Sequence, residues 1–494
     1  MAQKKTKIIR TALDGLPYGE ENEALLQGKV GKPRLPDGVS QKSMMRDIVV
    51  IAWPSLLELV LTQLTSMADQ IMVGRLPGEE GVMALAAVGL AAQPKFLLMT
   101  MIIALNVGAT ALVARFRGQQ DRGRASEVLR QALVLNVIIS AVFMGIGLWS
   151  SEWLIRFMSG SGAITEETLR LGVQYFDIQL YGFIPLCIGF TITAALRGIG
   201  ESRVPLVYNT IANVVNLVFN YVMIYGKLGC PAMGVAGASW ATVIGQTVAF
   251  VIAMGVVLSR RYYVWLDLKS RFRFDAGLIR SIVDIGVPSM VEQLFLRAGL
   301  IIYSRTVAGL GDMLFATHQV LMSVQAMTFM MGQAFANAAT TLMGQSLGKR
   351  RYDMAALYMR GTRNLGILAS LVLALLLVLF NRQIILLFND TPDVVNAGAP
   401  ILYLLAASQP FQADQFITSG GLRGAGDTRF TAIAIAITVL GVRSILGILT
   451  MNVLHWGLWG AWIALVADQM IRTVLMALRY HGGKWRRIGA AMGT

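Results

Sequence analysis

The sequence is short of charged residues, cysteine and histidine, and each shortage excludes a class of protein. Only 14% of the 494 residues are charged, against about 25% in soluble globular domains. The two cysteines, Cys187 and Cys230, are too few for a disulfide framework, and the three histidines are too scattered for a metal site. Signatures of soluble enzymes, such as a P-loop, G-x-S-x-G or H-E-x-x-H, are absent. We therefore expect no resident metal or cofactor, and we expect that the protein is not an enzyme.

Apolar residues take the place of the missing charge. They make up 55% of the chain, and the mean hydropathy is +0.59. This composition is typical of a polytopic membrane protein, in which lipid replaces water around the helices. The net charge of +15 could indicate a nucleic-acid partner. Because the lysines and arginines lie in short loops between apolar runs, we instead expect a lipid bilayer and no nucleic acid as partner.

Twelve apolar runs are long enough to cross a bilayer, which takes about 20 residues of helix. They predict an all-α integral membrane protein with twelve transmembrane helices. The runs lie at 47–73, 82–114, 125–149, 168–197, 203–225, 233–258, 277–307, 313–346, 354–380, 395–422, 428–452 and 459–479.

The loops between these runs alternate in charge. Loops such as "ARFRGQQDRGR" and "LGKRRYD" are basic, whereas "LPGEEG" and "NDTPD" in the other set are poor in lysine and arginine. By the positive-inside rule, the basic loops and both termini are cytoplasmic. The first forty residues contain no apolar stretch and no cleavage pattern. We therefore expect the first span to direct insertion into the plasma (inner) membrane.

The second half of the sequence repeats the first. "WPSLLELVLTQL" (53–64) matches "VPSMVEQLFLRA" (287–298), "GATALVARFRG" (108–118) matches "AATTLMGQSLG" (338–348), and "AALRGIGESR" (194–203) matches "GGLRGAGDTR" (420–429). Each half then holds six spans, an even number, so both insert in the same direction. We predict two six-helix lobes related by a pseudo-twofold axis along the membrane normal. The predicted parts are a flexible basic N-terminal tail (1–45), an N-lobe (46–258), a cytoplasmic linker (259–276), a C-lobe (277–480) and a C-terminal tail (481–494).

Two carboxylates lie within the first span, although each costs about 2.5–3.5 kcal/mol or more at the centre of a bilayer. Glu58 and Asp69 are eleven residues apart, so they share one stripe of the helix and lie about 16 Å apart along it. Pro54 precedes Glu58 by one turn and is expected to kink the helix, as is the matching Pro288. Each carboxylate has two interpretations, a structural partner of another helix or a functional group.

The fifth span carries a stripe of amides. In "YNTIANVVNLVFNYV", Asn209, Asn213, Asn216 and Asn220 recur at i, i+4, i+7 and i+11, which places them on one helical face. Amides can hold membrane helices together, at about 0.6 kcal/mol per contact. Four on a single stripe exceed what packing needs, which favours a hydrated or ion-facing surface.

In the second half, charged residues stand out in two spans. Asp414 lies in the middle of "QPFQADQFITSGGLRG", flanked by glutamines. Glu292 and Arg297 lie in the seventh span, five residues apart, so on a regular helix they point about 140° apart. Glu292 is a candidate for pairing across helices, and for Arg297 a structural and a functional role are equally open.

Together these motifs resemble the multidrug and toxic compound extrusion (MATE) transporters over essentially all twelve spans. The resemblance is carried by "ADQIMVG", "NVVNLVFNYVMIYGKLGCPAMGVAGASWAT", "GDMLFATHQV" and "DQFITSGGLRGAGDTR". It implies export of bulky, often cationic, organic compounds, coupled to inward flow of Na⁺ or H⁺ by alternating access of the two lobes. The family pattern also implies a first-lobe ion-coupling network, at Asp69, Tyr175, Thr193, Asn216, Asn220 and Thr242.

The sequence departs from the family pattern at two positions. Asn220 stands where one branch of the family has a second aspartate, which leaves the choice between H⁺ and Na⁺ open. Another branch pairs a glutamate of the seventh span with an aspartate of the tenth. Asp414 matches that aspartate, but Leu296 occupies the glutamate position, so Glu292, one turn away, is a candidate replacement. Arg297 is the third candidate in the second lobe.

Three functions compete. The resemblance favours a secondary active antiporter for bulky, cationic or amphiphilic organic compounds, acting as a monomer and holding at most a transient Na⁺. A lipid-precursor flippase of the same superfamily would favour a more strongly basic cavity, and Arg297 is the one obvious mid-span cation. An integral-membrane lipid-modifying enzyme would need acidic motifs at the membrane surface or a sizeable extramembrane domain, and neither is present.

Overall fold

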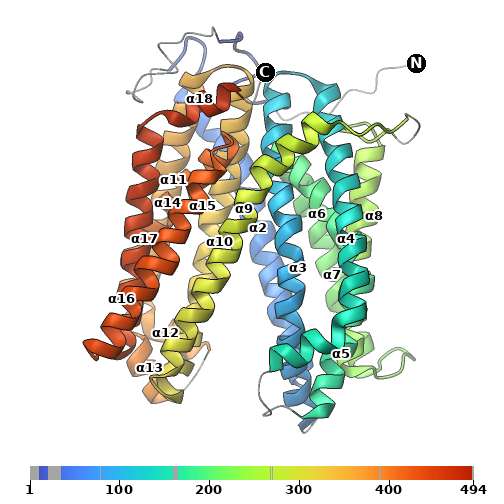
Figure 1. Ribbon diagram of the computed structural model, residues 1–494, viewed down its shortest axis with the longest axis vertical. Helices are drawn as coiled ribbons and strands as arrows, with labels where there is room; N and C mark the ends of the chain where they lie inside the picture. The colour runs from blue at the N-terminus through green and yellow to red at the C-terminus, as the bar shows by residue number, and fades with distance from the viewer. Residues whose placement is uncertain are drawn as a thin grey trace. The chain divides into compact units, whose positions relative to one another are not determined.

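A computed structural model describes residues 10–19, 35–77, 79–159, 165–267, 269, 271–388 and 391–491. Throughout these ranges the regular secondary structure is helical (Figure 1), which confirms the predicted all-α class. The helices of the first half are α2 (Gln41–Gly74), α3 (Glu79–Gly118), α4 (Arg122–Ser159), α5 (Glu166–Tyr181), α6 (Phe183–Gly198), α7 (Arg203–Tyr225) and α8 (Gly234–Leu258).

The second half begins with α9 (Ala276–Ala308), α10 (Asp312–Gly348) and α11 (Tyr352–Leu379). The short helices α12 (Asn381–Leu386) and α13 (Pro392–Gly398) lead into α14 (Ile401–Gly424). The next span is a continuous run of α15 (Thr428–Ile435), the π-helix η1 (Ala436–Arg443), α16 (Ser444–Ile448) and the π-helix η2 (Leu449–Val453). The chain ends with α17 (Gly457–His481) and α18 (Lys484–Ala491).

Each predicted span falls on one of these helices or on a run of them. By length and composition, nine candidate spans are found within the described ranges, and up to eleven if each of two bent helix pairs counts as one span. The remaining predicted span, 313–346, is covered by α10, which runs for 37 residues. α10 is not among the candidate spans because its polar side chains, His318 and Gln325 among them, lower its mean hydropathy.

Two predicted spans, 168–197 and 395–422, are not single straight helices. α5 and α6 meet at a bend of 52°, and α13 and α14 meet at a bend of 41°. Pro185 and Pro400 lie next to these bends, and proline lacks the N–H that would continue the helical hydrogen bonding. Local proline chemistry therefore breaks what the hydropathy pattern presents as continuous runs.

The chain divides into two compact units. Unit 1 includes Leu57–Val113 and Asp121–Val283, and unit 2 consists of Arg10–Leu56, Ala114–Gln120 and Asp284–Thr494. The division falls inside α2, so the first half of this helix packs with unit 2 and its second half with unit 1. The lobe boundaries predicted from the sequence stay a prediction, because compactness does not define which parts move together.

The internal repeat is visible in the helix packing of each unit. In unit 1, Thr110 Oγ1 donates to Ala194 O at 3.1 Å and links α3 to α6. In unit 2, the matching Thr340 Oγ1 donates to Gly420 O at 2.8 Å and links α10 to α14. The repeated sequence therefore builds the same interhelical contact twice.

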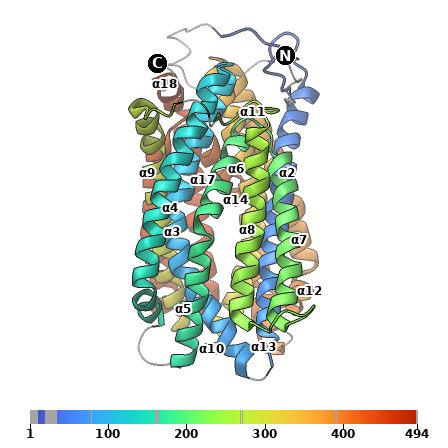
Figure 2. The same cartoon turned by 90° about the vertical axis from the view of Figure 1, so that its right-hand side faces the viewer.

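Glycines on α8 allow it to lie close against α7 (Figure 2). A Cβ at Gly237 would lie 2.6 Å from Met223 O, and one at Gly245 would lie 2.9 Å from Asn216 Cβ. Small residues at helix contacts are the usual means of close approach between membrane helices. The contact brings Asn216 on α7 beside Thr242 on α8.

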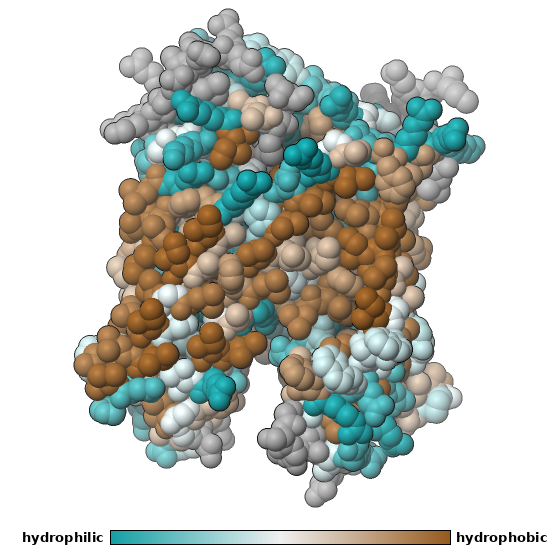
Figure 3. Space-filling view, in the orientation of Figure 1, coloured by the Kyte–Doolittle hydropathy of each residue, from teal (hydrophilic) through white to brown (hydrophobic). Residues whose placement is uncertain are grey.

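The helices present apolar side chains outward over their middle parts. Figure 3 shows these side chains on one face, with polar residues gathered toward the helix ends. On α4, Val142 is 51% exposed, and on α11, Leu368 is 60% and Val372 56% exposed. In water such a surface would be an aggregation hazard, whereas lipid solvates it.

The described part of the predicted N-terminal tail packs within unit 2. Leu13 is buried, Lys349 Nζ donates to its carbonyl oxygen at 2.6 Å, and Asp14 pairs with Arg117 at 3.0 Å. α2 begins at Gln41, inside the predicted tail. The rest of the two predicted tails, residues 1–9, 20–34 and 492–494, lies outside the described residues.

Candidate functional site

Asp69, on α2, is the centre of a polar group within unit 1. It is partly buried, and Asn220 on α7 donates an amide N–H to its Oδ1. Asn216, one turn earlier on α7, is assigned the amide orientation that satisfies both its ends. It then donates to Asp69 Oδ1 at 3.0 Å and accepts from Thr242 N at 3.2 Å. Two amide N–H donors therefore face the carboxylate.

A chain of polar contacts leads from this group to a lysine. The Tyr175 hydroxyl on α5 pairs with Thr242 on α8 and with Gln179, one turn further along α5. Lys95 on α3 donates its ammonium to Gln179 Oε1, and its charge interacts with that of Asp69. The site therefore holds one carboxylate and one ammonium, joined by amides and hydroxyls.

Lys95 and Gln179 are absent from the candidates drawn from the sequence. Lys95 is a mid-span cation, so Arg297 is not the one obvious cation of that kind. The signal was available, because Lys95 falls inside the apolar run 82–114 and an ionisable residue there is a functional candidate by default. Gln179 gave no signal of its own, because polar residues recur throughout α5.

Thr193, which the family pattern assigns to the Asp69 network, makes a different contact. It is buried on α6, and its hydroxyl hydrogen-bonds to that of Tyr208 on α7 at 2.5 Å. Tyr208 in turn interacts electrostatically with Glu58 and Arg197. Thr193 therefore belongs to a second polar group of unit 1.

Glu58 is the acidic member of this second group. Arg197 Nη2 on α6 lies 2.8 Å from Glu58 Oε2, and Asn209 on α7 donates to Oε1 at 2.6 Å. Glu58 is buried, and pairing both carboxylate oxygens offsets the cost of removing them from water. Of its two interpretations, the structural partner fits this geometry.

Asn213, between the two groups on the amide stripe, has no hydrogen-bond partner for its amide nitrogen within the described ranges.

Unit 2 repeats the glutamate–arginine arrangement. Glu292 on α9 lies 3.6 Å from Arg423 on α14, and Thr431 donates to it at 3.1 Å. Arg197 and Arg423 are the arginines of the two "LRG" motifs in the repeat. The sequence repeat thus encodes one glutamate–arginine pair in each unit.

The two prolines of the repeat lie at matching positions, and each is followed by a serine. Pro54 lies inside α2 and Pro288 inside α9, each four residues before the paired glutamate. The residue after each proline is a serine that donates back to the carbonyl four residues earlier, Ser55 at 3.2 Å and Ser289 at 3.1 Å. Such a bond satisfies a carbonyl near the point where proline interrupts the helical ladder.

Asp414 forms an ion pair with a different arginine, Arg363. Arg363 on α11 donates through Nε to Asp414 Oδ1 and through Nη2 to Oδ2 at 2.9 Å. Asp414 and Glu292 are therefore neutralised separately, each by a different arginine. Arg297 is partly buried on α9.

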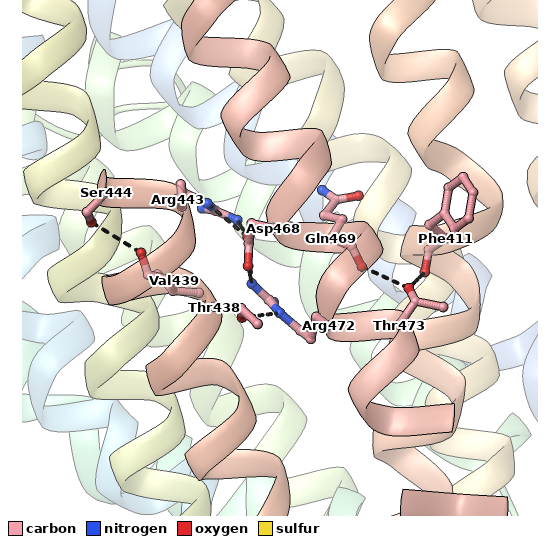
Figure 4. Close-up of polar contacts among 9 residues, drawn as sticks. All are labelled: Phe411, Thr438, Val439, Arg443, Ser444, Asp468, Gln469, Arg472 and Thr473. Carbon is pink, nitrogen blue, oxygen red and sulfur yellow. Dashed lines mark hydrogen bonds and ion pairs between the residues drawn. The ribbon is translucent and has the colours of Figure 1, made fainter. Parts of the chain in front are cut away.

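A charged group that the sequence did not reveal lies around Asp468 on α17 (Figure 4). Asp468 is fully buried and accepts from two arginines, Arg443 at the end of η1 and Arg472 one turn along α17. Arg443 Nε donates to Oδ2 at 3.0 Å, and Arg472 Nη2 donates to Oδ1 at 2.6 Å. Arg472 also donates to Thr438 at 3.0 Å. The i, i+4 spacing of Asp468 and Arg472 is readable in the sequence, but only the fold supplies Arg443.

Comparison with known proteins finds relatives along most of the chain. The MatE family model matches residues 54–222 and 288–449. The probable multidrug resistance protein NorM of Thermotoga maritima is 26% identical, covering 90% of this chain and 93% of NorM. The uncharacterized transporter YisQ of Bacillus subtilis is 27% identical, covering 89% of this chain and 95% of YisQ. The multidrug resistance protein MdtK of Yersinia pestis is 27% identical, covering 88% and 94%.

The fold is similar to that of solved transporter structures. A MOP superfamily transporter from Pyrococcus furiosus matches with a TM-score of 0.81 and 22% identity, covering 96% of this chain and 99% of that chain. A multidrug resistance MATE family transporter, solved in an outward-facing conformation, matches with a TM-score of 0.80 over the same shares of both chains and at the same identity. These matches confirm the predicted architecture of twelve helices in two lobes.

Proposed function

The chain belongs to the MATE family of transporters, which are multi-pass membrane proteins and not enzymes, and we propose from this that it is a secondary active antiporter. It exports bulky, cationic or amphiphilic organic compounds and takes up H⁺ or Na⁺ in exchange. The relatives NorM and MdtK are named for multidrug resistance, which supports small organic molecules as substrates.

The observation that carries this proposal is the setting of Asp69. A partly buried carboxylate, held by two amides inside an apolar bundle, is a group that can bind a cation reversibly. It accepts a proton as a carboxylic acid, or it supplies charge and oxygen to Na⁺. Ion coupling needs this kind of group, because an ion shifts a conformational equilibrium only if it binds the two states differently.

Transport proceeds in this proposal by alternating access. The Asp69 network, from Lys95 to Asn220, lies wholly within unit 1, so ion binding acts first on the packing of that unit. Substrate release then follows from the change of access. Asp414 with Arg363 is the corresponding candidate within unit 2.

We further propose that the protein is a monomer in the plasma membrane with both termini in the cytoplasm. The alternation of basic and acidic loops supports this orientation. Reporter fusions at the C-terminus and in the turn at 119–121 should both report cytoplasm. A periplasmic signal from either fusion would contradict the orientation.

The test of the function is transport by purified protein in proteoliposomes. Movement of a fluorescent organic cation, ethidium, should be driven by a pH gradient or by a Na⁺ gradient applied separately, and should cease when the gradient is collapsed. Movement that is equally fast without any gradient would indicate a passive pathway instead. Empty liposomes and the Asp69→Asn variant are the controls.

A further inference from the structure

We propose that Lys95 is a resident cation of the Asp69 network and makes this transporter select H⁺ over Na⁺ as its coupling ion. The inference rests on the proposed function, because it names the ion that the Asp69 site takes. It concerns a residue that lies outside the sequence-derived candidates.

Lys95 lies where a positive charge is costly. It lies within α3, in the apolar run "LAAQPKFLLMTMIIAL", where an ammonium without a partner is costly. Its Nζ donates to Gln179 Oε1, and Gln179 is buried. A neutral amide satisfies one N–H of the ammonium but leaves its charge in place, so the charge must be compensated elsewhere.

Asp69, the carboxylate of the network, acts on that charge through space. Its carboxylate interacts electrostatically with Lys95, and the two are linked through Gln179, Tyr175 and Thr242. Two other titratable groups interact electrostatically with the pair, Tyr175 on α5 with Asp69 and Cys187 on α6 with Lys95. From α7 and α8 the network receives uncharged amides and a hydroxyl.

The orientation of the amides around Asp69 also favours a proton. Hard cations such as Na⁺ are bound by shells of oxygen ligands. Here Asn220 donates an amide N–H to Asp69, and Asn216 does so in the amide orientation that satisfies both its ends, an arrangement that suits a bare carboxylate.

A proton and Na⁺ each add one positive charge, but they differ in what they require. Na⁺ needs several oxygens to turn toward it, and the nearby ammonium repels it. A proton forms an O–H bond with Asp69 and needs no coordination shell. Once Asp69 is neutral, the Lys95 charge is left uncompensated inside unit 1, which gives the two protonation states different preferred packings.

The decisive experiment measures Na⁺ binding without any substrate. Purified wild type, Lys95→Gln and Lys95→Met are titrated in detergent with NaCl against choline chloride at constant ionic strength, and the Tm is recorded. Wild type should show no Na⁺-specific shift. The two neutral variants should gain a saturable rise in Tm of about 2–4 °C, which a second substitution, Asp69→Asn, should remove.

Two further variants serve as controls. Lys95→Arg keeps the positive charge and should stay insensitive to Na⁺. Lys227→Gln removes one charge from the exposed loop after α7 and should also stay insensitive. A Na⁺-specific shift in wild type, or its absence in both folded neutral variants, overturns the inference.

Transport separates this inference from the proposed function. In proteoliposomes, a pH gradient alone should drive ethidium transport by wild type, and Lys95→Gln should respond to a Na⁺ gradient. If no gradient drives transport by wild type, the proposed function fails for this substrate, and the Na⁺ titration still decides the role of Lys95. Transport by wild type that a Na⁺ gradient drives at constant pH contradicts the inference directly.

Discussion

Glu58 and Arg197 form an ion pair of 2.8 Å between α2 and α6. The equivalent pair in unit 2, between Glu292 and Arg423, has a distance of 3.6 Å. In both units the glutamate follows a proline by one turn, and the arginine belongs to an "LRG" motif at the end of another helix. Each glutamate thus has a direct ion pair with an arginine, whereas the hydrogen bonds that Asp69 accepts come from neutral amides.

Replacement of Glu58 by Gln should destabilise the protein. It leaves Arg197 without its charge partner, at a cost of about 3 kcal/mol, the low end for buried pairs because the Arg197 side chain is 20% exposed. The Tm of the purified variant should fall, and transport per folded molecule should persist. Glu152→Gln, which removes one partner of an exposed pair with Arg156, is the control and should leave the Tm unchanged. A Glu58→Gln protein with the wild-type Tm and no transport would indicate a coupling role.

Replacement of Asp69 by Asn should abolish gradient-driven transport and preserve folding. The amide keeps the size and hydrogen bonding of the carboxyl group but neither releases a proton nor supplies a full charge. Ethidium transport in proteoliposomes is the measurement, with Tm as the check on folding. The control variant Asp177→Asn loses a carboxylate on another helix, α5, and should transport normally. Coupled transport by well-folded Asp69→Asn protein would move the coupling site to Asp414.

Replacement of Asp468 by Asn should be among the most destabilising single changes in the chain. It leaves two arginines, Arg443 and Arg472, buried around a neutral amide, and breaking a buried ion pair costs about 3–5 kcal/mol. The yield of folded protein after membrane extraction should fall sharply. A second change, Arg443→Gln, removes one of the surplus charges and should restore part of the yield. If the double variant is no better than Asp468→Asn, charge imbalance is not the cause.

Replacement of Gly424 by Ala should loosen the contact between α14 and α10. The added Cβ would lie 2.4 Å from Thr340 O, and overpacking of this kind costs about 1–3 kcal/mol. The matching Gly198→Ala change in unit 1 should cost less, because its Cβ would lie 2.8 Å from Thr110 O. Gly145→Ala, on α4, has nothing within 4 Å of the new Cβ and should be neutral or stabilising. Equal Tm values for all three variants would show that these contacts are soft.

The helices were predictable because a membrane-spanning segment needs a long apolar run, and such runs are visible in one dimension. The breaks within these helices were harder to predict. Pro185 and Pro400 break two runs that hydropathy presents as continuous, and the stretch from Ala436 to Arg443 is a π-helix. The repeat was also readable, since it brings Thr110 and Thr340 to the same contact in each unit.

The polar groups were predictable only where their members share one helix. The stripe of asparagines on α7 defines a face, and the structure brings Asn216 and Asn220 to Asp69 on that face. Arg197, Arg363 and Arg443 are brought to their carboxylates from other helices, and spacing along the chain contains no information on such partners. Lys95 is different, because an intramembrane lysine is a signal in itself.

The shared helix α2 has a consequence for expressing the protein in pieces. The sequence predicts a linker at 259–276, but a cut there leaves Ile48, Ile51 and Ala52 on the N-terminal fragment. These side chains pack with Leu342 and Met354 in the core of unit 2. The C-terminal fragment alone would therefore lack part of its own interior and should be degraded or aggregate in the membrane. Co-expression of both fragments should rescue it, so that a genetic screen for fragment complementation would select for the packing of a single helix.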